Sequence, residues 1–249
     1  MNASTRREGD RVPDVSFRIR RDSGWATTDT RELFAGKNVV VFALPGAFTP
    51  TCSSSHLPRY NELAPVFRDN GIDSVVCLSV NDPYVMQQWA IEQGCGNVAM
   101  IPDGNASFTE QMGMLVDKTG ENQGRRSRRY SMLVRDGRIE KMFIEPDRPG
   151  DPFEVSDADT MLDYINPKAR RPDQVAAFVR AGCEHCARAK RVLRDAGIDF
   201  VEIELPAAVR MRAVAAVSGE RTVPQVFANG RRIGGADDVQ RWLAERSRR

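Results

Sequence analysis

The sequence predicts an α/β protein with two domains in tandem, and three observations support this. Apolar runs of strand length alternate with segments of helix length over residues 39–165. Residues 166–173 (NPKARRPD) then combine two prolines and three cations with no apolar anchor, which is typical of a flexible linker. A shorter series of strands and helices starts again at residue 174. A chain of 249 residues is long enough for two ordinary domains, so we expect them over residues 1–165 and 174–249.

Each element of the first domain has its own local signal. Five runs predict strands, over residues 39–44, 74–80, 99–101, 130–135 and 138–144. Three helices are expected, over about residues 51–67, 83–93 and 156–165. Residues 81–83 (Asn-Asp-Pro) provide a cap with proline in the first turn of the second helix, and Ser156 is the expected cap of the third. Asp136-Gly137 is a strong hairpin signal between the last two strands.

The second domain is smaller, and the order of its elements identifies its fold. Strands are expected over residues 174–179, 199–204, 225–228 and 231–233, and helices over residues 183–196, 206–218 and 237–246. Asn229-Gly230 is another hairpin turn. This order, βαβ followed by ββα in about 76 residues, is the minimal thioredoxin fold. The first domain has the same kinds of element with insertions, so the predicted fold class is α/β, with two thioredoxin-fold domains in tandem.

Composition excludes several classes of protein. Apolar content of 41% and charged content of 28% are those of a soluble globular protein. A net charge of +2 creates no overall field that would draw the chain to nucleic acid or to an anionic membrane. No apolar core of a signal peptide follows Arg6-Arg7, and no segment has the length of a membrane span. Five cysteines are too few for a disulfide-stapled secreted domain, so we expect a cytoplasmic protein.

Cys52 ends the loop of residues 45–52 (PGAFTPTC), which directly follows the first predicted strand. The attacking species of a cysteine is the thiolate, and the first turn of a helix favours that anion through its unpaired N–H groups. Pro50 directs an extended entry, and the Thr49 hydroxyl can both donate to and accept from an oxygen species. The arrangement suits a thiolate that attacks an O–O bond, although a lone cysteine after a strand is more often a packing residue.

The spacing Pro45-x-x-x-Thr49-x-x-Cys52 closely resembles the peroxidatic motif of the peroxiredoxins. The segments HLPRY, VVCLSVND and RYSMLV narrow the resemblance to the Prx5 subfamily. It implies that Cys52 is the peroxidatic cysteine and that Arg129 contacts its sulfur, stabilises the thiolate and binds peroxide oxygen. As alternatives, residues 125–129 could be a solvated basic loop or a nucleic-acid patch, but the near-neutral chain and the lack of interleaved aromatics disfavour the patch.

The remaining residues of the first domain that could react are assigned more ordinary roles. Residues 145–165 contain no cysteine, which departs from the family members that carry a resolving cysteine there. Cys77 is expected to be buried and inert. Cys95 lies in a predicted loop and could react, but nothing in the family pattern matches a resolving role. His56 is expected on the helix surface, without a catalytic role.

In the second domain, Cys183-Glu184-His185-Cys186 places two thiols at a helix start. Cys183 is the expected nucleophile, because it lies nearest the helix N-terminus. A Cys-x-x-Cys pair can also be half of a zinc site, but a structural zinc needs four ligands. Only His185 and the distant His56 are available to complete such a set, so no metal site is expected.

Residues 221–227 (RTVPQVF) and 233–238 (IGGADD) resemble the glutaredoxins. The resemblance implies a cis-proline facing the dithiol, and glutathione contacts from Arg180, Thr222, Val223, Pro224, Asp237 and Asp238. Backbone groups of Val223 would pair with the extended tripeptide. The two aspartates would receive its ammonium group, and Arg180 a carboxylate. One departure affects the redox poise: Glu184 and His185 stand between the cysteines where the family has proline and an aromatic residue.

Together these resemblances imply a hybrid peroxiredoxin–glutaredoxin: a glutathione-dependent peroxidase for hydrogen peroxide and small alkyl hydroperoxides. Cys52 would be oxidised to a sulfenic acid and captured by glutathione, and Cys183 and Cys186 would remove the glutathionyl group. Glutathione would be a co-substrate, renewed by glutathione reductase, with no tightly bound cofactor. The resemblance also implies a homo-oligomer, a dimer or tetramer. Whether Cys183 serves Cys52 of its own chain or of a neighbouring chain stays open. The alternatives are a peroxide-sensing, redox-regulated binding protein and a thioredoxin-dependent peroxidase.

Overall fold

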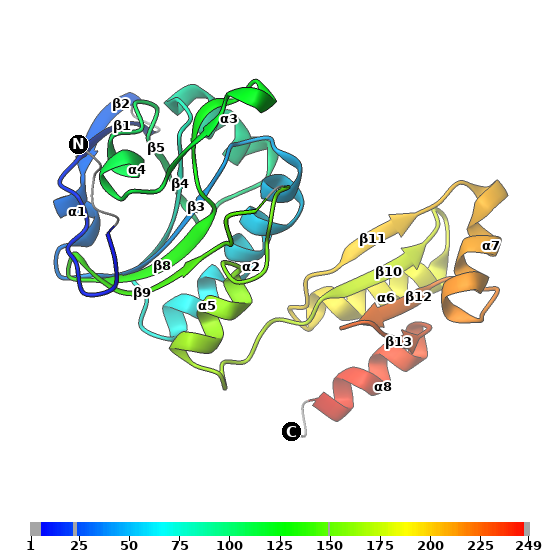
Figure 1. Cartoon of the computed structure of the whole chain (residues 1–249). Coiled ribbons are helices and arrows are strands. Elements are labelled where there is room, and N and C mark those ends of the chain that lie inside the picture. The colour runs from blue at the N-terminus through cyan, green and yellow to red at the C-terminus, as the bar shows by residue number, and fades with distance from the viewer. Residues whose placement is uncertain (1–5, 22–23, 149, 247–249) are drawn as a thin grey trace. The chain divides into compact units, whose positions relative to one another are not determined.

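The structure is a computed structural model that describes residues 6–21, 24–148 and 150–246. It divides the chain into two compact units, Met1–Arg171 and Pro172–Arg249 (Figure 1). The division falls inside the stretch that the sequence predicts to be a linker.

The first unit is built on a five-stranded sheet with the order β5-β4-β3-β8-β9. Its strands are β5 (Ala99–Pro102), β4 (Ser74–Ser79), β3 (Asn38–Leu44), β8 (Tyr130–Arg135) and β9 (Arg138–Ile144). The central strand β3 pairs in parallel with β4 and antiparallel with β8. All five strands occur where the sequence predicts them, because each is an apolar run bounded by turn residues.

Both faces of this sheet are buried, and alternation along β3 divides the core in two. Val40, Phe42 and Leu44 belong to one apolar cluster, which includes side chains of α2 (Leu57–Asp69), α3 (Pro83–Glu92) and α5 (Ala158–Ile165). Val39, Val41 and Ala43 belong to the other, which includes β1 (Ser16–Arg21), α1 (Thr30–Phe34) and α4 (Ser107–Gln111). This two-sided burial explains why β3 reads as a continuous apolar run.

The predicted cap of the closing helix is wrong by one residue. α5 begins at Ala158, and the carboxylate of Asp157 accepts the N–H of Thr160 at 3.0 Å. Ser156 instead donates its hydroxyl to Glu145 at 2.7 Å. A longer-range hydrogen bond therefore uses the side chain that local sequence assigns to the cap.

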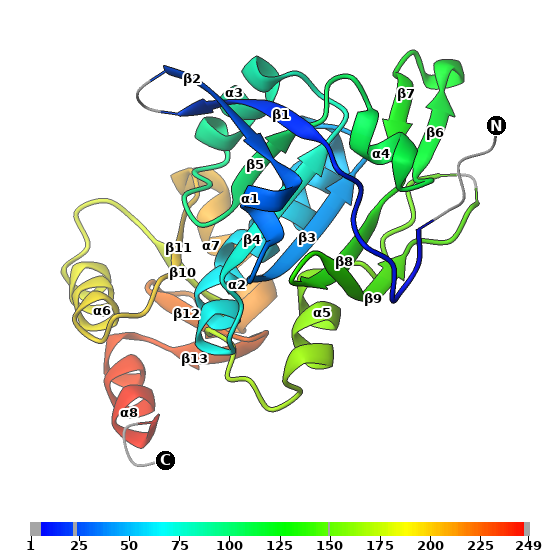
Figure 2. The ribbon, with the colours of Figure 1, turned by 90° about the vertical axis from the view of Figure 1, so that its left-hand side faces the viewer.

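Two small ribbons of the first unit were not predicted. In the first ribbon, β1 pairs with β2 (Gly24–Asp29). In the second, β6 (Leu115–Lys118) pairs with β7 (Gly124–Ser127), and the short helix η2 (Thr119–Glu121) lies between them in the sequence. Figure 2 shows β6 and β7 beside α4, apart from the five-stranded sheet. In β6 (LVDK) and β7 (GRRS) the apolar alternation that marks a strand is weak, whereas β1 (SFRIRR) does alternate and its signal was missed.

The second unit has the predicted βαβ-ββα order around a four-stranded sheet, β11-β10-β12-β13. Its strands are β10 (Val175–Val179), β11 (Val201–Glu204), β12 (Gln225–Ala228) and β13 (Arg231–Gly234). Its helices are α6 (Glu184–Asp195), α7 (Ala207–Ser218) and α8 (Ala236–Arg246). β10 pairs in parallel with β11 and antiparallel with β12. The thioredoxin-fold prediction is confirmed.

Two charged side chains of the predicted linker make bonds to neighbouring residues. Residues 166–173 contain no helix or strand, but Arg171 donates to Asp159 at 2.7 Å and to Asp163 at 2.6 Å. Asp173 pairs with Arg246 and accepts from Asn229 at 2.6 Å. Arg171 therefore binds the stretch to the first unit, and Asp173 binds it to the second.

Candidate active site

Cys52 lies where β3 gives way to a helix. The residues that follow β4 hold its loop, because the Ala47 N–H donates to the Asn81 side chain at 3.0 Å. Phe48 has a left-handed backbone, with φ of 64°, and the Thr49 hydroxyl donates to the Gly46 carbonyl at 2.9 Å. Helical conformation begins at residue 50, and its Cys52–His56 turn, η1, is a π-helix that leads into α2. The Cys52 side chain is therefore in the first turns of a helix, as predicted, and it is fully buried.

Arg129 contacts this sulfur from the strand beside β3. It immediately precedes β8, whose antiparallel register places Tyr130 opposite Ala43 near the end of β3. The Arg129 side chain is almost fully buried, and its Nη1 lies 3.3 Å from Cys52 Sγ. Its Nε is buried and has no hydrogen-bond acceptor among the described residues. A fixed cation thus faces the thiol, and its Nε–H is a donor that a bound oxygen could use.

His56 is the residue that sequence reasoning placed wrongly. It is fully buried, with Nδ1 at 3.2 Å from Arg129 Nη1 and Nε2 at 3.2 Å from the Ser156 carbonyl oxygen. Burial and the nearby Arg129 charge lower the pKa of His56 to about 3, so the imidazole is neutral. A carbonyl only accepts, which makes Nε2 the donor and Nδ1 the acceptor from Arg129. The spacing Cys52, His56, Tyr60 along one helix face was the signal that could have shown this.

A segment between β9 and α5 covers the other side of Arg129. Asp151 pairs with Arg129 Nη2, and the Phe153 ring lies 5.5 Å from the guanidinium carbon and 4.9 Å from the His56 ring. Partial burial opposes ionisation of Asp151, but hydrogen bonds from Arg129 and Thr51 hold its pKa below the ordinary value. No motif in the sequence indicated either residue.

Glu145 anchors this covering segment. Its buried carboxylate accepts the N–H groups of Glu154, Val155 and Ser156 at 2.8 to 3.0 Å, together with the Ser156 hydroxyl. A carboxylate with this many donors holds the backbone in one conformation. Glu145 therefore positions the segment that carries Asp151 and Phe153.

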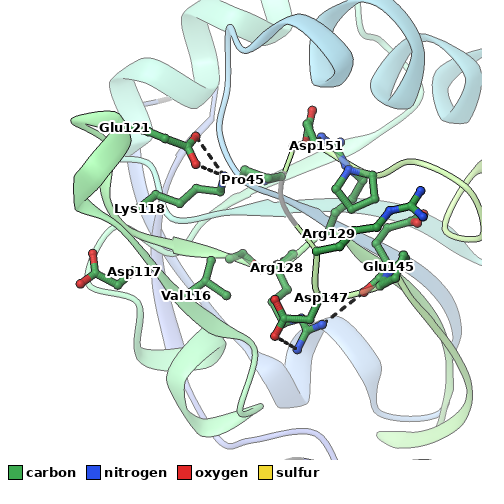
Figure 3. Close-up of a pocket in the computed structure, with 15 residues that line it drawn as sticks. Pro45, Val116, Asp117, Lys118, Glu121, Arg128, Arg129, Glu145, Asp147 and Asp151 are labelled. Atoms are coloured by element: carbon green, nitrogen blue, oxygen red, sulfur yellow. Dashed lines mark hydrogen bonds and ion pairs between the residues drawn. The ribbon is translucent and has the colours of Figure 1, made fainter.

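A cavity of about 210 Å³ opens beside the thiol site, between the β6–β7 ribbon and the residues after β9 (Figure 3). Pro45 and Arg129 line it, so the guanidinium that contacts Cys52 also forms part of the cavity wall. Cys52 itself is not among the lining residues. The residues predicted from the motif therefore lie together, with Thr49 in the same loop.

The other reactive candidates of this unit are accounted for by burial or by partners. Cys77 is fully buried, which raises its pKa well above the ordinary value, and burial raises the pKa of Cys95 to about 11. Arg125 pairs with Glu110 at 2.6 Å, and Arg126 donates to the Val80 carbonyl at 3.1 Å. The arginine run is part of a β-ribbon and its edge, not a solvated loop.

The second unit brings Cys183 and Cys186 to the start of α6, with Cys183 as its N-cap. The Cys186 N–H donates to Cys183 Sγ at 3.2 Å. Burial opposes ionisation of Cys183, but the hydrogen bonds from Cys186 and the charge of Arg180 lower its pKa below the ordinary value. Burial and the neighbouring Cys183 raise the pKa of Cys186 to about 11. Cys183 is therefore the more readily ionised thiol.

The predicted cis-proline is present, since the Val223-Pro224 peptide bond is cis and the Val223 carbonyl lies 3.9 Å from Cys183 Sγ. The charge of Arg180 acts on both thiols, and the other three predicted glutathione contacts are Thr222, Asp237 and Asp238. Arg180 and Thr222 are exposed. Asp237 pairs with Arg188 at 2.6 Å, and Asp238 pairs with Arg241 and accepts the Gly235 N–H at 2.8 Å.

In the parts of the chain that the structure describes, no group of three or more His, Cys, Asp or Glu side chains is arranged to hold a metal ion. Within those same ranges, no helix has the length and apolar character needed to cross a membrane.

Each of the two units matches a known protein family. Residues 7–162 match the family model described as Redoxin, and residues 175–233 match the one described as Glutaredoxin. The chain is 54% identical over 237 residues to the "Hybrid peroxiredoxin hyPrx5" of Haemophilus influenzae, covering 95% of this chain and 98% of that protein. It is also 54% identical over 186 residues to the "Peroxiredoxin sll1621" of Synechocystis, covering 68% of this chain and 98% of the relative.

Solved structures resemble the first unit. Reduced Prx3 of Vibrio vulnificus in complex with hydrogen peroxide is 38% identical, with a TM-score of 0.62, over 65% of this chain and 99% of the other. The 1-Cys peroxiredoxin of Plasmodium falciparum is 34% identical, also with a TM-score of 0.62, over 66% of this chain and all of the other.

Proposed function

The chain belongs to the peroxiredoxins, as a hybrid in which a Prx5-type peroxiredoxin domain is followed by a glutaredoxin domain, and from this premise we propose that it is a glutathione-dependent peroxidase. Its substrates would be hydrogen peroxide and small alkyl hydroperoxides. The observation that carries the proposal is the 3.3 Å contact between Arg129 Nη1 and Cys52 Sγ in a fully buried site. This contact places a fixed positive charge against the sulfur that would attack the O–O bond.

In the first step the Cys52 thiolate attacks one peroxide oxygen. The S–O bond forms as the O–O bond breaks, so the sulfur is oxidised to a sulfenate and the departing oxygen takes a proton to leave as water or an alcohol. Cys52, His56 and Asp151 engage three of the five Arg129 N–H groups, and the buried Nε–H is one of the two donors that remain for developing negative charge. Pro45 and Thr49 would shape the loop around the reacting atoms.

In the second step an external thiol reduces Cys52, because residues 145–165 contain no cysteine and burial raises the pKa of both Cys77 and Cys95. Glutathione attacks the sulfenic acid, and water leaves as the mixed disulfide forms. Cys183, whose pKa is lowered, then attacks that disulfide, taking the glutathionyl group and releasing the Cys52 thiolate. A second glutathione, or Cys186, attacks the Cys183 mixed disulfide, and glutathione reductase would renew the glutathione. Arg180, Thr222, Val223, Pro224, Asp237 and Asp238 are the proposed glutathione contacts of this domain.

The proposal extends to location and assembly. All five cysteines are free, as suits the cytoplasm, where glutathione is kept reduced. Phe48 and Tyr84 expose 48% and 65% of their surface, which supports self-association as a dimer or tetramer.

The test is a coupled assay in which peroxide consumption is followed with glutathione and glutathione reductase. Wild type should turn over steadily, Cys52→Ser should be inactive, and Cys95→Ser should match wild type. A peroxide sensor would consume one equivalent and stop. Turnover that requires thioredoxin and its reductase, with none on glutathione, would overturn the proposal in favour of a thioredoxin-dependent enzyme.

A further inference from the structure

The cavity beside Arg129 has a size and position that suit a small molecule that reacts with Cys52. Its volume of about 210 Å³ is below the roughly 300–1,000 Å³ of sites that enclose a whole drug-sized ligand. It can therefore hold one end of a small molecule while the rest extends beyond it. Arg129 forms part of the wall and touches the sulfur, so a ligand bound here is separated from the reacting atom by a single guanidinium.

The cavity is lined by five carboxylates (Asp117, Glu121, Glu145, Asp147 and Asp151) and by four cations: Lys118, Arg128, Arg129 and Arg148. Each of the four cations has a carboxylate partner, but the ion pairs differ in strength. Lys118 pairs with Glu121 at 2.9 Å, whereas Arg128 pairs with Asp147 at 3.5 Å, and the Asp147 side chain is 85% exposed. An ion pair this long and this open to water contributes little. Arg128 is the cation whose partner an incoming anion can most easily replace.

Arg128 is also fixed in place before any ligand arrives. Its Nη2 donates to the backbone carbonyl of Glu145 at 3.2 Å, and only 28% of its side chain is exposed (Figure 3). Its backbone N–H donates to the Met114 carbonyl at 2.7 Å, which ties it to the β6–β7 ribbon. A preorganised guanidinium binds a carboxylate through paired N–H donors, with less loss of side-chain freedom than a mobile lysine.

We propose that Arg128 binds a carboxylate of glutathione in this cavity and thereby directs the tripeptide's thiol to the oxidised Cys52. The inference rests on the proposed glutathione-dependent function and assigns that step a binding site on the peroxiredoxin domain. In the reaction the glutathione thiolate forms an S–S bond to the Cys52 sulfur and the S–O bond breaks. Cys52 is reduced, glutathione is oxidised to the mixed disulfide, and the hydroxide takes up the thiol proton to leave as water.

The experiment uses the full chain with Cys183→Ser and Cys186→Ser, so that the mixed disulfide at Cys52 accumulates. Cys52 is oxidised with one equivalent of hydrogen peroxide, and reduction of the sulfenic acid is followed by stopped-flow and mass spectrometry. Two thiols are compared: glutathione, which carries carboxylates, and 2-mercaptoethanol, which has none. Arg128→Gln should slow the reaction with glutathione roughly tenfold or more, by loss of a charge-assisted hydrogen bond.

In the same variant the rate with 2-mercaptoethanol and the initial oxidation by peroxide should be unchanged, which also shows that the domain is folded. Arg128→Lys should retain part of the glutathione rate. The matched control is Arg125→Gln, an arginine of the same ribbon that pairs with Glu110 and does not line the cavity. Equal glutathione rates in the Arg128→Gln, Arg125→Gln and parent chains would overturn the Arg128 site alone. Failure of glutathione to reduce the parent chain would overturn the glutathione-dependent function and the site with it.

Discussion

His56 Nδ1 accepts a hydrogen bond from Nη1 of Arg129 at 3.2 Å, and the same nitrogen of Arg129 lies 3.3 Å from the sulfur of Cys52. The imidazole is neutral and its other nitrogen is held by the Ser156 carbonyl. A neutral acceptor orients the guanidinium without cancelling its charge. His56 is therefore a positioning residue for Arg129.

Removing the Arg129 charge should slow the peroxide step. We expect Arg129→Gln to lower the second-order rate constant of Cys52 with hydrogen peroxide by roughly 10²–10³-fold, as for loss of one preorganised donor to developing charge. Arg129→Lys should be intermediate, because it keeps the charge without the fork of donors. The rate is measured as the single-turnover burst without any reductant. A burst of wild-type rate in Arg129→Gln would show that the 3.3 Å contact is not catalytic.

Burial of a neutral His56 should make the first unit less stable in mild acid. Its pKa of about 3 in the folded protein is below the ordinary 6.5, so the unfolded chain binds more protons between these values, and stability falls as the pH falls from about 6.5 toward 3. From pH 7 to pH 5 this group alone should remove about 2 kcal/mol.

Urea unfolding followed by the fluorescence of the buried Trp89 measures this effect, with Trp25→Phe and Trp242→Phe as background. His56→Phe is the matched control, since it has no proton to bind. An equal loss of stability in His56→Phe and in its His56-containing parent would show that His56 is not the group responsible.

Glu145 should hold the segment that covers the site. In Glu145→Ala the N–H groups of Glu154, Val155 and Ser156 lose their acceptor, so we expect about 2 kcal/mol or more of lost stability and faster hydrogen exchange of these amides. Exchange resolved by mass spectrometry checks this. Glu140→Ala is the control, because Glu140 is at the surface and pairs with Arg135. Unchanged exchange over residues 150–156 would contradict the anchoring role.

The two thiols of the second unit should differ sharply in reactivity. Cys183, with a lowered pKa, should be alkylated by iodoacetamide at pH 7 much faster than Cys186, whose pKa is about 11. Mass spectrometry of the modified peptides identifies the site. Because glutathione can resolve Cys183, we also expect Cys186→Ser to keep glutathione-supported turnover. Preferential labelling of Cys186 would reverse the assigned roles.

Much of the fold could be predicted because local signals and tertiary structure agree. β3 is a continuous apolar run and both its faces are buried, and Asp136-Gly137 forms the turn between β8 and β9. The β6–β7 ribbon was missed because its strands carry charges whose partners, such as Glu110, lie elsewhere in the chain. The partners of Arg171 and Asp173 were missed for the same reason, because only the fold brings them near.

In the site, too, some residues carry a local sequence signal and others are brought in only by the fold. The Pro45, Thr49 and Cys52 spacing is local and carries its own signal, and the Arg129 position follows from the family resemblance. Asp151 and Phe153 could not be found from sequence, since a covering segment needs shape and anchoring by Glu145, not a motif. His56 was assigned to the surface although its spacing from Cys52 puts it on the buried helix face.

The central claim is that Cys52 reduces peroxide and that Cys183 recycles it through glutathione, and trapping the intermediate tests this most directly. Full-length Cys183→Ser is mixed with hydrogen peroxide and glutathione, and the products are mapped by mass spectrometry. We predict one burst of peroxide reduction per chain, no steady turnover, and glutathione bound to Cys52. Steady turnover in this variant, or a Cys52 that carries no glutathione, would contradict the account.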